Sequence, residues 1–302
     1  MPSEIGFTAE AREAESKVPD TSGDRLFGRP ALLVMTFAMP IALVFGVGLG
    51  WLASTLDRGG RLAVGNTGRT LSSVIWSDNA LVVVGGGTTR SDLADLVDRS
   101  TLPWHRHISL LVIGPNSDQA LGVLDVIRRG GVETVAVAGI PESEPIWDSL
   151  ESEAIQHHTT IKYVNQATRV TVTPHLAVEL VPVETTSKTN SEGAIVRVQA
   201  GSMRFSWISG ISKNSRIPPA DPLFDLRANV VIDADGGTWL PEVGTPALSF
   251  QPAAARSSAM TKPPSRFART LDGGDQVQLR FNGNELRLPR GQVTDMHAVG
   301  SD

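Results

Sequence analysis

An uninterrupted apolar segment near the N-terminus constrains this chain most. Residues 31–54, ALLVMTFAMPIALVFGVGLGWLAS, form a run of 24 residues without a charged side chain. As a helix the run would be about 36 Å long at about 1.5 Å per residue, and the hydrocarbon core of a bilayer is about 30 Å thick. Pro40 is tolerated in a membrane helix as a kink, and Trp51 suits a membrane interface. The sequence therefore predicts one transmembrane helix that contacts membrane lipid.

A buried core helix and a signal peptide both fit this run less well. Core helices are seldom so long and so apolar, and a signal peptide usually starts nearer the N-terminus with a shorter apolar stretch. Residues 1–30 are polar and of mixed charge, which predicts a disordered N-terminal tail. Arg25 and Arg29 precede the run closely, and this slightly favours a cytoplasmic N-terminus. We therefore expect a single-pass protein of the cell membrane with an extracytoplasmic C-terminal domain.

Composition excludes several classes of protein. The chain has no cysteine, which excludes disulfide scaffolds, thiolate zinc sites and cysteine nucleophiles. Its net charge of −5 argues against a protein that coats DNA, because phosphate contacts need an excess of basic residues. A hydrophobic content of 41% excludes a wholly disordered chain.

Residues 60–290 carry the pattern of a globular domain. Helical periodicity occurs at 91–98, 117–129 and 144–156. Short β-branched segments bounded by turn residues predict strands at 74–76, 81–84, 110–113, 134–138, 161–164, 169–172, 177–181, 194–199, 203–208, 230–232, 247–250, 276–281 and 285–288. Asn282-Gly283 predicts a two-residue hairpin between the last two strands. Strands that first alternate with helices and then follow one another predict an α/β sandwich of mixed sheets, followed by a disordered tail at 291–302.

One segment carries a resemblance to a known family. Residues 110–122, LLVIGPNSDQALG, join an apolar strand to a proline-containing turn and a helix that opens near Asp118. This order resembles the motif T-H-x-H-x-D-H-x-G-G of the metallo-β-lactamase-like fold. Further segments resemble other motifs of that family in the same order, at 81–87 (LVVVGGG), 132–139, 190–210 and 228–237 (ANVVIDADGG). The pattern is most similar to the metallo-β-lactamase-like domains of competence-type DNA-uptake channels, and it implies an αββα sandwich over residues 62–290.

The positions that this family gives to metal ligands carry other residue types here. The resemblance places the three motif histidines on Gly114, Asn116 and Gln119, the bridging carboxylate on Ile211, and the last histidine near Ala234 or Asp235. Asp118 alone keeps the residue type of the family. A two-metal hydrolase needs its ligand cluster to lower the pKa of bound water. The resemblance therefore implies a degenerate site without a metal cofactor, in a binding or scaffold module of a cell-envelope assembly that has a protein partner in the membrane.

The carboxylates near this site allow a second hypothesis. Asp118, Asp233 and Asp235 could hold a divalent cation such as Mg²⁺ in a rearranged, phosphodiesterase-like hydrolase. The simpler interpretation is that Asp118 caps or orients the start of a helix and that Asp233 and Asp235 belong to a turn. Likewise, the glycines at 85–87 could bind an anion through backbone amides or could simply form a tight turn.

A basic run gives a third hypothesis. Arg256, Lys262, Arg266 and Arg269 lie in a stretch from 252 to 270 that contains no acidic residue. Such a run could contact nucleic acid or anionic lipid, as in a DNA-binding accessory protein. A solvated surface loop is the alternative that the sequence leaves open.

Overall fold

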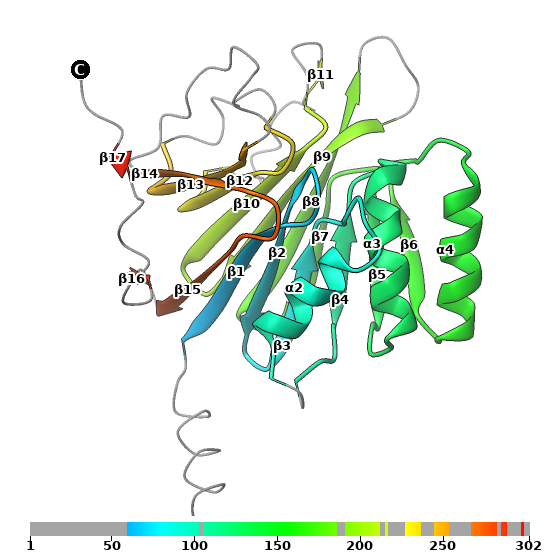
Figure 1. Cartoon of the computed structure of the whole chain (residues 1–302), viewed down its shortest axis with the longest axis horizontal. Helices are drawn as coiled ribbons and strands as arrows, with labels where there is room; N and C mark the ends of the chain where they lie inside the picture. The colour runs from blue at the N-terminus through cyan, green and yellow to red at the C-terminus, as the bar shows by residue number, and fades with distance from the viewer. Residues whose placement is uncertain are drawn as a thin grey trace, which may run out of the picture. The chain divides into compact units, whose positions relative to one another are not determined.

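A computed structural model of the chain describes one compact unit, which lies within Arg58–Asp302 (Figure 1). The structure describes residues 59–102, 105–185, 191–211, 215–216, 227–236, 245–253, 267–282, 285–288 and 297–298. The predicted tail 1–30 and the predicted membrane segment 31–54 lie outside these ranges. None of the helices within them has the length and apolar character needed to cross a bilayer.

The first sheet combines antiparallel and parallel strands. Its order is β16–β15–β1–β2–β3–β4–β5–β6. The strands are β1 (Gly60–Asn66), β2 (Leu71–Ser77), β3 (Ala80–Val84), β4 (Leu110–Ile113), β5 (Thr134–Ala138), β6 (Thr160–Val164), β15 (Gln276–Asn282) and β16 (Glu285–Arg287). Strands β3 to β6 run parallel to one another, and the remaining neighbours in this sheet are antiparallel.

Three helices connect the parallel strands and cover one face of this sheet (Figure 1). They are α2 (Asp92–Ser100), α3 (Ser117–Arg128) and α4 (Pro145–Gln156). Their apolar faces, with residues such as Leu93, Val123 and Leu150, pack on outward-facing residues of β3, β4 and β5. Gly130 and Gly131 follow α3 with positive φ values of 79° and 85°, which glycine adopts without strain, and so the helix ends there.

The second sheet is also mixed. Its order is β11–β8–β9–β10–β12–β13–β14–β17, with β7 paired to β8. The strands are β7 (Thr168–Thr173), β8 (Leu176–Thr185), β9 (Ser191–Ala200), β10 (Met203–Ser209), β11 (Ser215–Arg216), β12 (Val230–Asp233), β13 (Leu248–Pro252), β14 (Phe267–Leu271) and β17 (His297–Ala298). Strands β10, β12, β13 and β14 run parallel, whereas β7 to β10 form an antiparallel series.

The main core lies between the two sheets. Alternate residues of each strand point into it, because successive side chains of a strand face opposite sides. Phe205 of β10 and Phe281 of β15 meet there with ring centroids 5.0 Å apart. The buried Trp207 indole nitrogen donates to the Leu71 carbonyl oxygen at 2.8 Å, which ties β10 to β2. Both sheets are therefore held in one α/β unit.

Most of the sequence predictions agree with this architecture, and some do not. The α/β class with mixed sheets is confirmed, as are all three helices and the hairpin, in which Asn282 lies opposite Glu285. Strands β1, β11, β14 and β17 were not predicted. The disordered tail predicted at 291–302 stays a prediction. The described residues include no helix on the outer face of the second sheet. The fourth layer of the αββα sandwich therefore stays a prediction.

Candidate functional site

The triple glycine after β3 packs directly against helix α3. A Cβ atom on Gly86 would lie 2.2 Å from the Gln119 carbonyl oxygen, and one on Gly122 would lie 2.8 Å from the Gly87 nitrogen. The Gly122 amide donates to the Gly87 carbonyl at 3.0 Å. Only residues without a side chain permit so close an approach of backbone to helix. The glycines thus fix the position of α3 beside the end of β3.

Two of the three glycine amides of this turn donate to protein carbonyls. Gly85 N donates to Val112 O at 2.8 Å, and Gly87 N donates to Gln119 O at 3.3 Å. The Gly86 carbonyl accepts hydrogen bonds from Thr67 Oγ1 at 2.8 Å and from Ser72 Oγ at 2.5 Å. The prediction of a tight turn is confirmed, and the Gly85 and Gly87 amides are already used within the protein.

Asn116 begins helix α3. Its backbone is extended, with φ −80° and ψ 126°, and its side-chain Oδ1 accepts a hydrogen bond from the Asp118 amide at 3.1 Å. Asp118 is exposed in the first turn. The interpretation of Asp118 as the capping residue is therefore wrong, since Asn116 supplies the cap. Asp118 instead lies where a negative charge interacts favourably with the helix dipole.

Gln119 lies at the centre of the site. Its side chain is buried, and both ends of its amide are used: Oε1 accepts from the Gly114 amide at 2.9 Å, and Nε2 donates to Ser209 Oγ at 2.8 Å. Ser209 Oγ in turn donates to Asp235 Oδ2 at 2.6 Å, and the Gly210 amide donates to the same oxygen at 2.7 Å. We call the chain formed by Gly114, Gln119, Ser209 and Asp235 the glutamine link.

The glutamine link joins elements that are far apart in the sequence. Gly114 follows β4 and Gln119 belongs to α3, both on the first sheet, whereas Ser209 ends β10 and Asp235 follows β12 in the second sheet. Since β10 and β12 are parallel neighbours, their ends meet at the same edge. The link therefore closes the edge of the sandwich at the place where the resemblance puts metal ligands.

Ile211 and Asp233, two further predicted site residues, are not members of the glutamine link. Ile211 is buried in a small apolar cluster with Val231 on the outer face of the second sheet. Asp233 lies between Ile232 and Ala234, which both face the main core, so its side chain lies on the opposite face. The structure thus brings together Gly114, Gln119 and Asp235, whereas Ile211 and Asp233 lie on the outer face of the second sheet.

The residues of this site do not fit a zinc ion. Zinc in proteins is bound by imidazole, thiolate or carboxylate donors. Gln119 is neutral and uses both amide ends within the protein, and Gly114 offers only a backbone amide that already donates to Gln119. Across the described ranges, no three histidine, aspartate or glutamate side chains form a group that could hold a metal ion. The hypothesis that Asp118, Asp233 and Asp235 together hold a divalent cation is therefore wrong.

The basic run predicted to contact nucleic acid or lipid is described only in part. Arg269 belongs to β14, where it lies opposite Phe250 of β13. It is half-buried within the sheet, so the expectation of a solvated loop is wrong at this residue. Arg256, Lys262 and Arg266 lie outside the described residues.

Comparisons with known proteins give a structural likeness only. No protein-family model matches the sequence, and no curated protein is significantly similar to it. The chain is similar to Zn(2+)-bound PqqB from Methylobacterium extorquens, with 14% identity over 57% of this chain and 71% of that chain and a TM-score of 0.40. It is similar to the metallo-beta-lactamase fold protein YhfI from Bacillus subtilis, with 9% identity over 73% and 99% of the two chains and a TM-score of 0.47.

A third similar structure is a diphosphatase from the PhnP family. The identity is 15%, 76% of this chain and 100% of that chain are covered, and the TM-score is 0.44. Because these scores are low, the likenesses carry no argument about activity. The α/β fold with mixed sheets, as described above, is consistent with the metallo-β-lactamase-like fold. A fold shared at this level does not establish a function.

Sequence reasoning missed the partner residues of the site. Ser209 ends a strand as an ordinary polar residue, and nothing in its neighbourhood marks it as the acceptor for Gln119. Thr67 and Ser72 lie in and after a strand-to-strand turn, where hydroxyls are common. Only the pairing of β10 with β12 could have brought Ser209 and Asp235 together, and that pairing is not local in sequence.

Proposed function

We propose that this chain is a single-pass, membrane-anchored protein whose globular unit is a non-catalytic relative of the metallo-β-lactamase-like fold. In this proposal residues 31–54 form the anchor, and the globular unit lies outside the cytoplasm. It works as a binding or scaffold module in a cell-envelope assembly, beside a protein partner in the membrane. The resemblance to DNA-uptake channels suggests that the assembly is connected with DNA uptake.

The observation that carries the proposal is the glutamine link. At the edge where the resemblance places metal ligands, the buried Gln119 amide spans from Gly114 N to Ser209 Oγ. A hydrolase of this class needs a metal to generate hydroxide at neutral pH and to clamp the leaving oxygen. A buried, fully hydrogen-bonded amide supplies neither. It does supply rigidity, since satisfied buried polar networks fix a single arrangement of the chains around them. A rigid edge without reactive groups suits a module that is bound by other proteins.

Metal content and hydrolysis test the proposal on the full chain. The purified protein would be equilibrated with Zn²⁺ or Mn²⁺, desalted, and analysed for bound metal by mass spectrometry. We expect no stoichiometric metal and no hydrolysis of phosphodiester or ester substrates above the rate of a Gln119→Ala variant. Two tightly bound metal ions per chain, together with an activity that a chelator removes, would overturn the proposal.

A further inference from the structure

Three arginines and a tryptophan form one row across four neighbouring strands of the first sheet. Arg287 of β16 lies opposite Arg280 of β15, Arg280 lies opposite Arg61 of β1, and Arg61 lies opposite Trp76 of β2. Residues directly opposite in antiparallel strands share one face of the sheet. We call these four residues the cationic row. It lies on the face that carries the helices, on strands beyond those that α3 and α4 cover (Figure 1).

The three arginines of the row bring like charges close together on one face of the sheet. Like charges directly opposite each other in a sheet destabilise the pairing. Arg287 is compensated by Glu285, whose carboxylate it contacts at 2.7 Å. Arg61 has no carboxylate at contact distance among the described residues, and its Nε atom is buried without a hydrogen-bond partner there. Its guanidinium carbon instead lies 5.7 Å from the centroid of the Trp76 ring. An anion bound beside Arg61 would give its guanidinium the partner that it lacks among the described residues.

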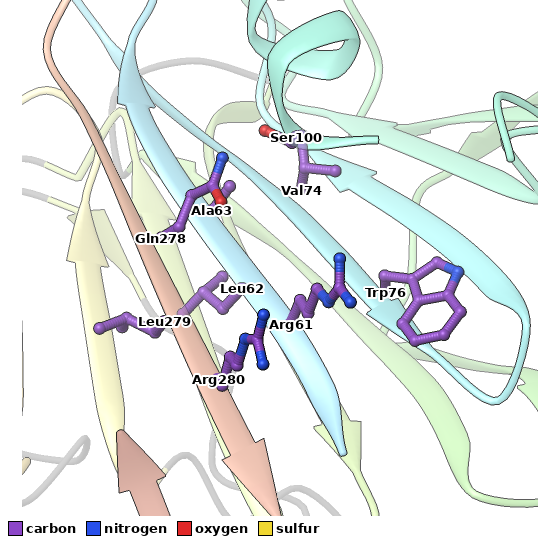
Figure 2. Close-up of a pocket in the computed structure, with 9 residues that line it drawn as sticks. All are labelled: Arg61, Leu62, Ala63, Val74, Trp76, Ser100, Gln278, Leu279 and Arg280. Atoms are coloured by element: carbon purple, nitrogen blue, oxygen red, sulfur yellow. The ribbon is translucent and has the colours of Figure 1, made fainter. Parts of the chain in front are cut away.

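A cavity of about 170 Å³ opens beside the row. Figure 2 shows Arg280, Arg61 and Trp76 following one another across β15, β1 and β2, with Gln278 and Ser100 beside them. The described residues that line the cavity include two arginines, a glutamine and a serine, and they include no carboxylate. Guanidinium groups bind phosphate oxygens well. The two arginines are the donors that matter here, because the Ser100 hydroxyl already donates to the Leu96 carbonyl at 2.6 Å and Gln278 Nε2 donates to the Arg99 carbonyl at 3.2 Å.

Chain connectivity favours a membrane as the source of phosphate. Arg61 follows Ser54, the last residue of the predicted membrane segment, by seven positions. Seven extended residues reach at most about 25 Å, so an anchored chain holds Arg61 within about that distance of the bilayer surface. Arginine and tryptophan are also residue types found at membrane interfaces. The net charge of −5 disfavours a nucleic acid as the partner.

We propose that the cationic row binds the phosphate headgroups of anionic phospholipids and holds the globular unit against the bilayer. This inference rests on the membrane anchoring in the proposed function. It is independent of the basic run at 256–269. The surface potential of an anionic membrane changes the ratio of docked to undocked protein by about fivefold for each arginine near it. Loss of Arg61 and Arg280 together would therefore release most of the docked population.

Because the chain has no cysteine, a single introduced cysteine can be labelled selectively. Asn282→Cys places a single thiol at an exposed residue that shares a face with Arg280, two positions along β15. The full chain, labelled there with an environment-sensitive fluorophore, is placed in nanodiscs of phosphatidylcholine with or without phosphatidylglycerol. A nitroxide on the lipid headgroup quenches the label when this face meets the bilayer. We expect several-fold stronger quenching in the anionic nanodiscs, and a loss of that difference in high salt because the Debye length falls from about 10 Å at 0.1 M to about 3 Å at 1 M.

Matched variants distinguish an effect of the cationic row from an effect of the total charge of the protein. Arg61→Gln with Arg280→Gln should abolish the dependence on anionic lipid, whereas the lysine versions of both should keep most of it. The control is Arg69→Gln with Arg90→Gln, which removes the same charge from exposed residues. Arg69 follows the last residue of β1 and Arg90 follows the last residue of β3, whereas Arg61 lies at the start of β1. Near-ultraviolet circular dichroism confirms folding of each variant.

The experiment distinguishes failure of this inference from failure of the proposed function. A chain that inserts and folds, yet shows the same quenching in both lipid mixtures or the same loss in the control variant, overturns the inference. A label that responds to single-stranded DNA in place of anionic lipid also overturns it. A chain that does not co-purify with nanodiscs contradicts the anchoring part of the proposed function instead.

Discussion

Gln119 Nε2 donates a hydrogen bond of 2.8 Å to Ser209 Oγ, and this bond ties helix α3 on the first sheet to the end of β10 in the second. Both side chains are buried. The bond connects the two sheets through neutral groups. A buried hydrogen bond of this kind is far weaker than a metal site, and so its removal should be measurable without unfolding the chain.

Gln119→Ala should lower the free energy of unfolding by about 2 kcal/mol, because the buried Gly114 amide and Ser209 hydroxyl lose a partner. Urea denaturation of the full chain in detergent measures the change. Gln199→Ala is the matched control, since Gln199 bonds only to the nearby Gly201 carbonyl at the surface, and its effect should stay within about 0.5 kcal/mol. A double-mutant cycle with Ser209→Ala should give a coupling of about 1 kcal/mol. Additive effects would show that the two side chains do not interact in solution.

Gly122→Ala tests the close packing of α3 on the triple-glycine turn. In a free helix this change stabilises by about 1 kcal/mol. Here the new Cβ would lie 2.8 Å from Gly87 N, so we expect a net destabilisation of about 1–3 kcal/mol. Ser152→Ala, at an exposed position of α4, should instead be neutral or slightly stabilising. If Gly122→Ala stabilised the protein as Ser152→Ala does, the backbone contact would be looser than the structure indicates.

The sequence predicted the parts of this fold that depend on local pattern. The strands with β-branched residues and the three amphipathic helices could be found, as could the hairpin at Asn282. Strand β1, GRLAVGN, was missed because two glycines and two polar residues interrupt its apolar pattern, and its place in the sheet depends on pairing with β15 more than 200 residues later. That Gly114, Asn116 and Gln119 occupy former ligand positions stays a prediction.

The sequence could not show which hydrogen bonds the side chains near α3 form. Asn116 and Asp118 are both good capping residues, and only the backbone conformation decides between them. The glutamine link needs the ends of β4, β10 and β12 at one edge, which is a property of the whole topology. The cationic row depends on the same kind of information. The hairpin alone predicts that Arg280 opposes Arg287, but Arg61 joins them only through the long-range pairing of β1 with β15.

The capping role of Asn116 predicts an unequal effect of two neighbouring substitutions. Asn116→Ala removes the acceptor for the Asp118 amide and should destabilise the protein by about 1 kcal/mol. Asp118→Ala removes only a charge near the helix N-terminus and should cost about half as much, with a smaller effect in high salt. Chemical denaturation at low and high ionic strength measures both. A larger loss for Asp118→Ala than for Asn116→Ala would contradict the assignment of the cap.

The contact between α3 and α4 predicts that the stability of the protein depends on pH. The hydrogen bond from Arg128 Nη2 to Glu153 Oε2, at 3.1 Å, lowers the pKa of Glu153 below its ordinary value, assisted by the positive charge of Arg128. Because the folded-state pKa of this carboxyl is depressed, its contribution to stability is present above the unfolded-state pKa and is lost as pH falls through the folded-state pKa. In Arg128→Gln the titration midpoint of Glu153, followed by NMR of its side-chain carboxyl carbon, should rise toward the ordinary value. An unchanged midpoint for Glu153 in that variant would show that the ion pair is not formed in solution.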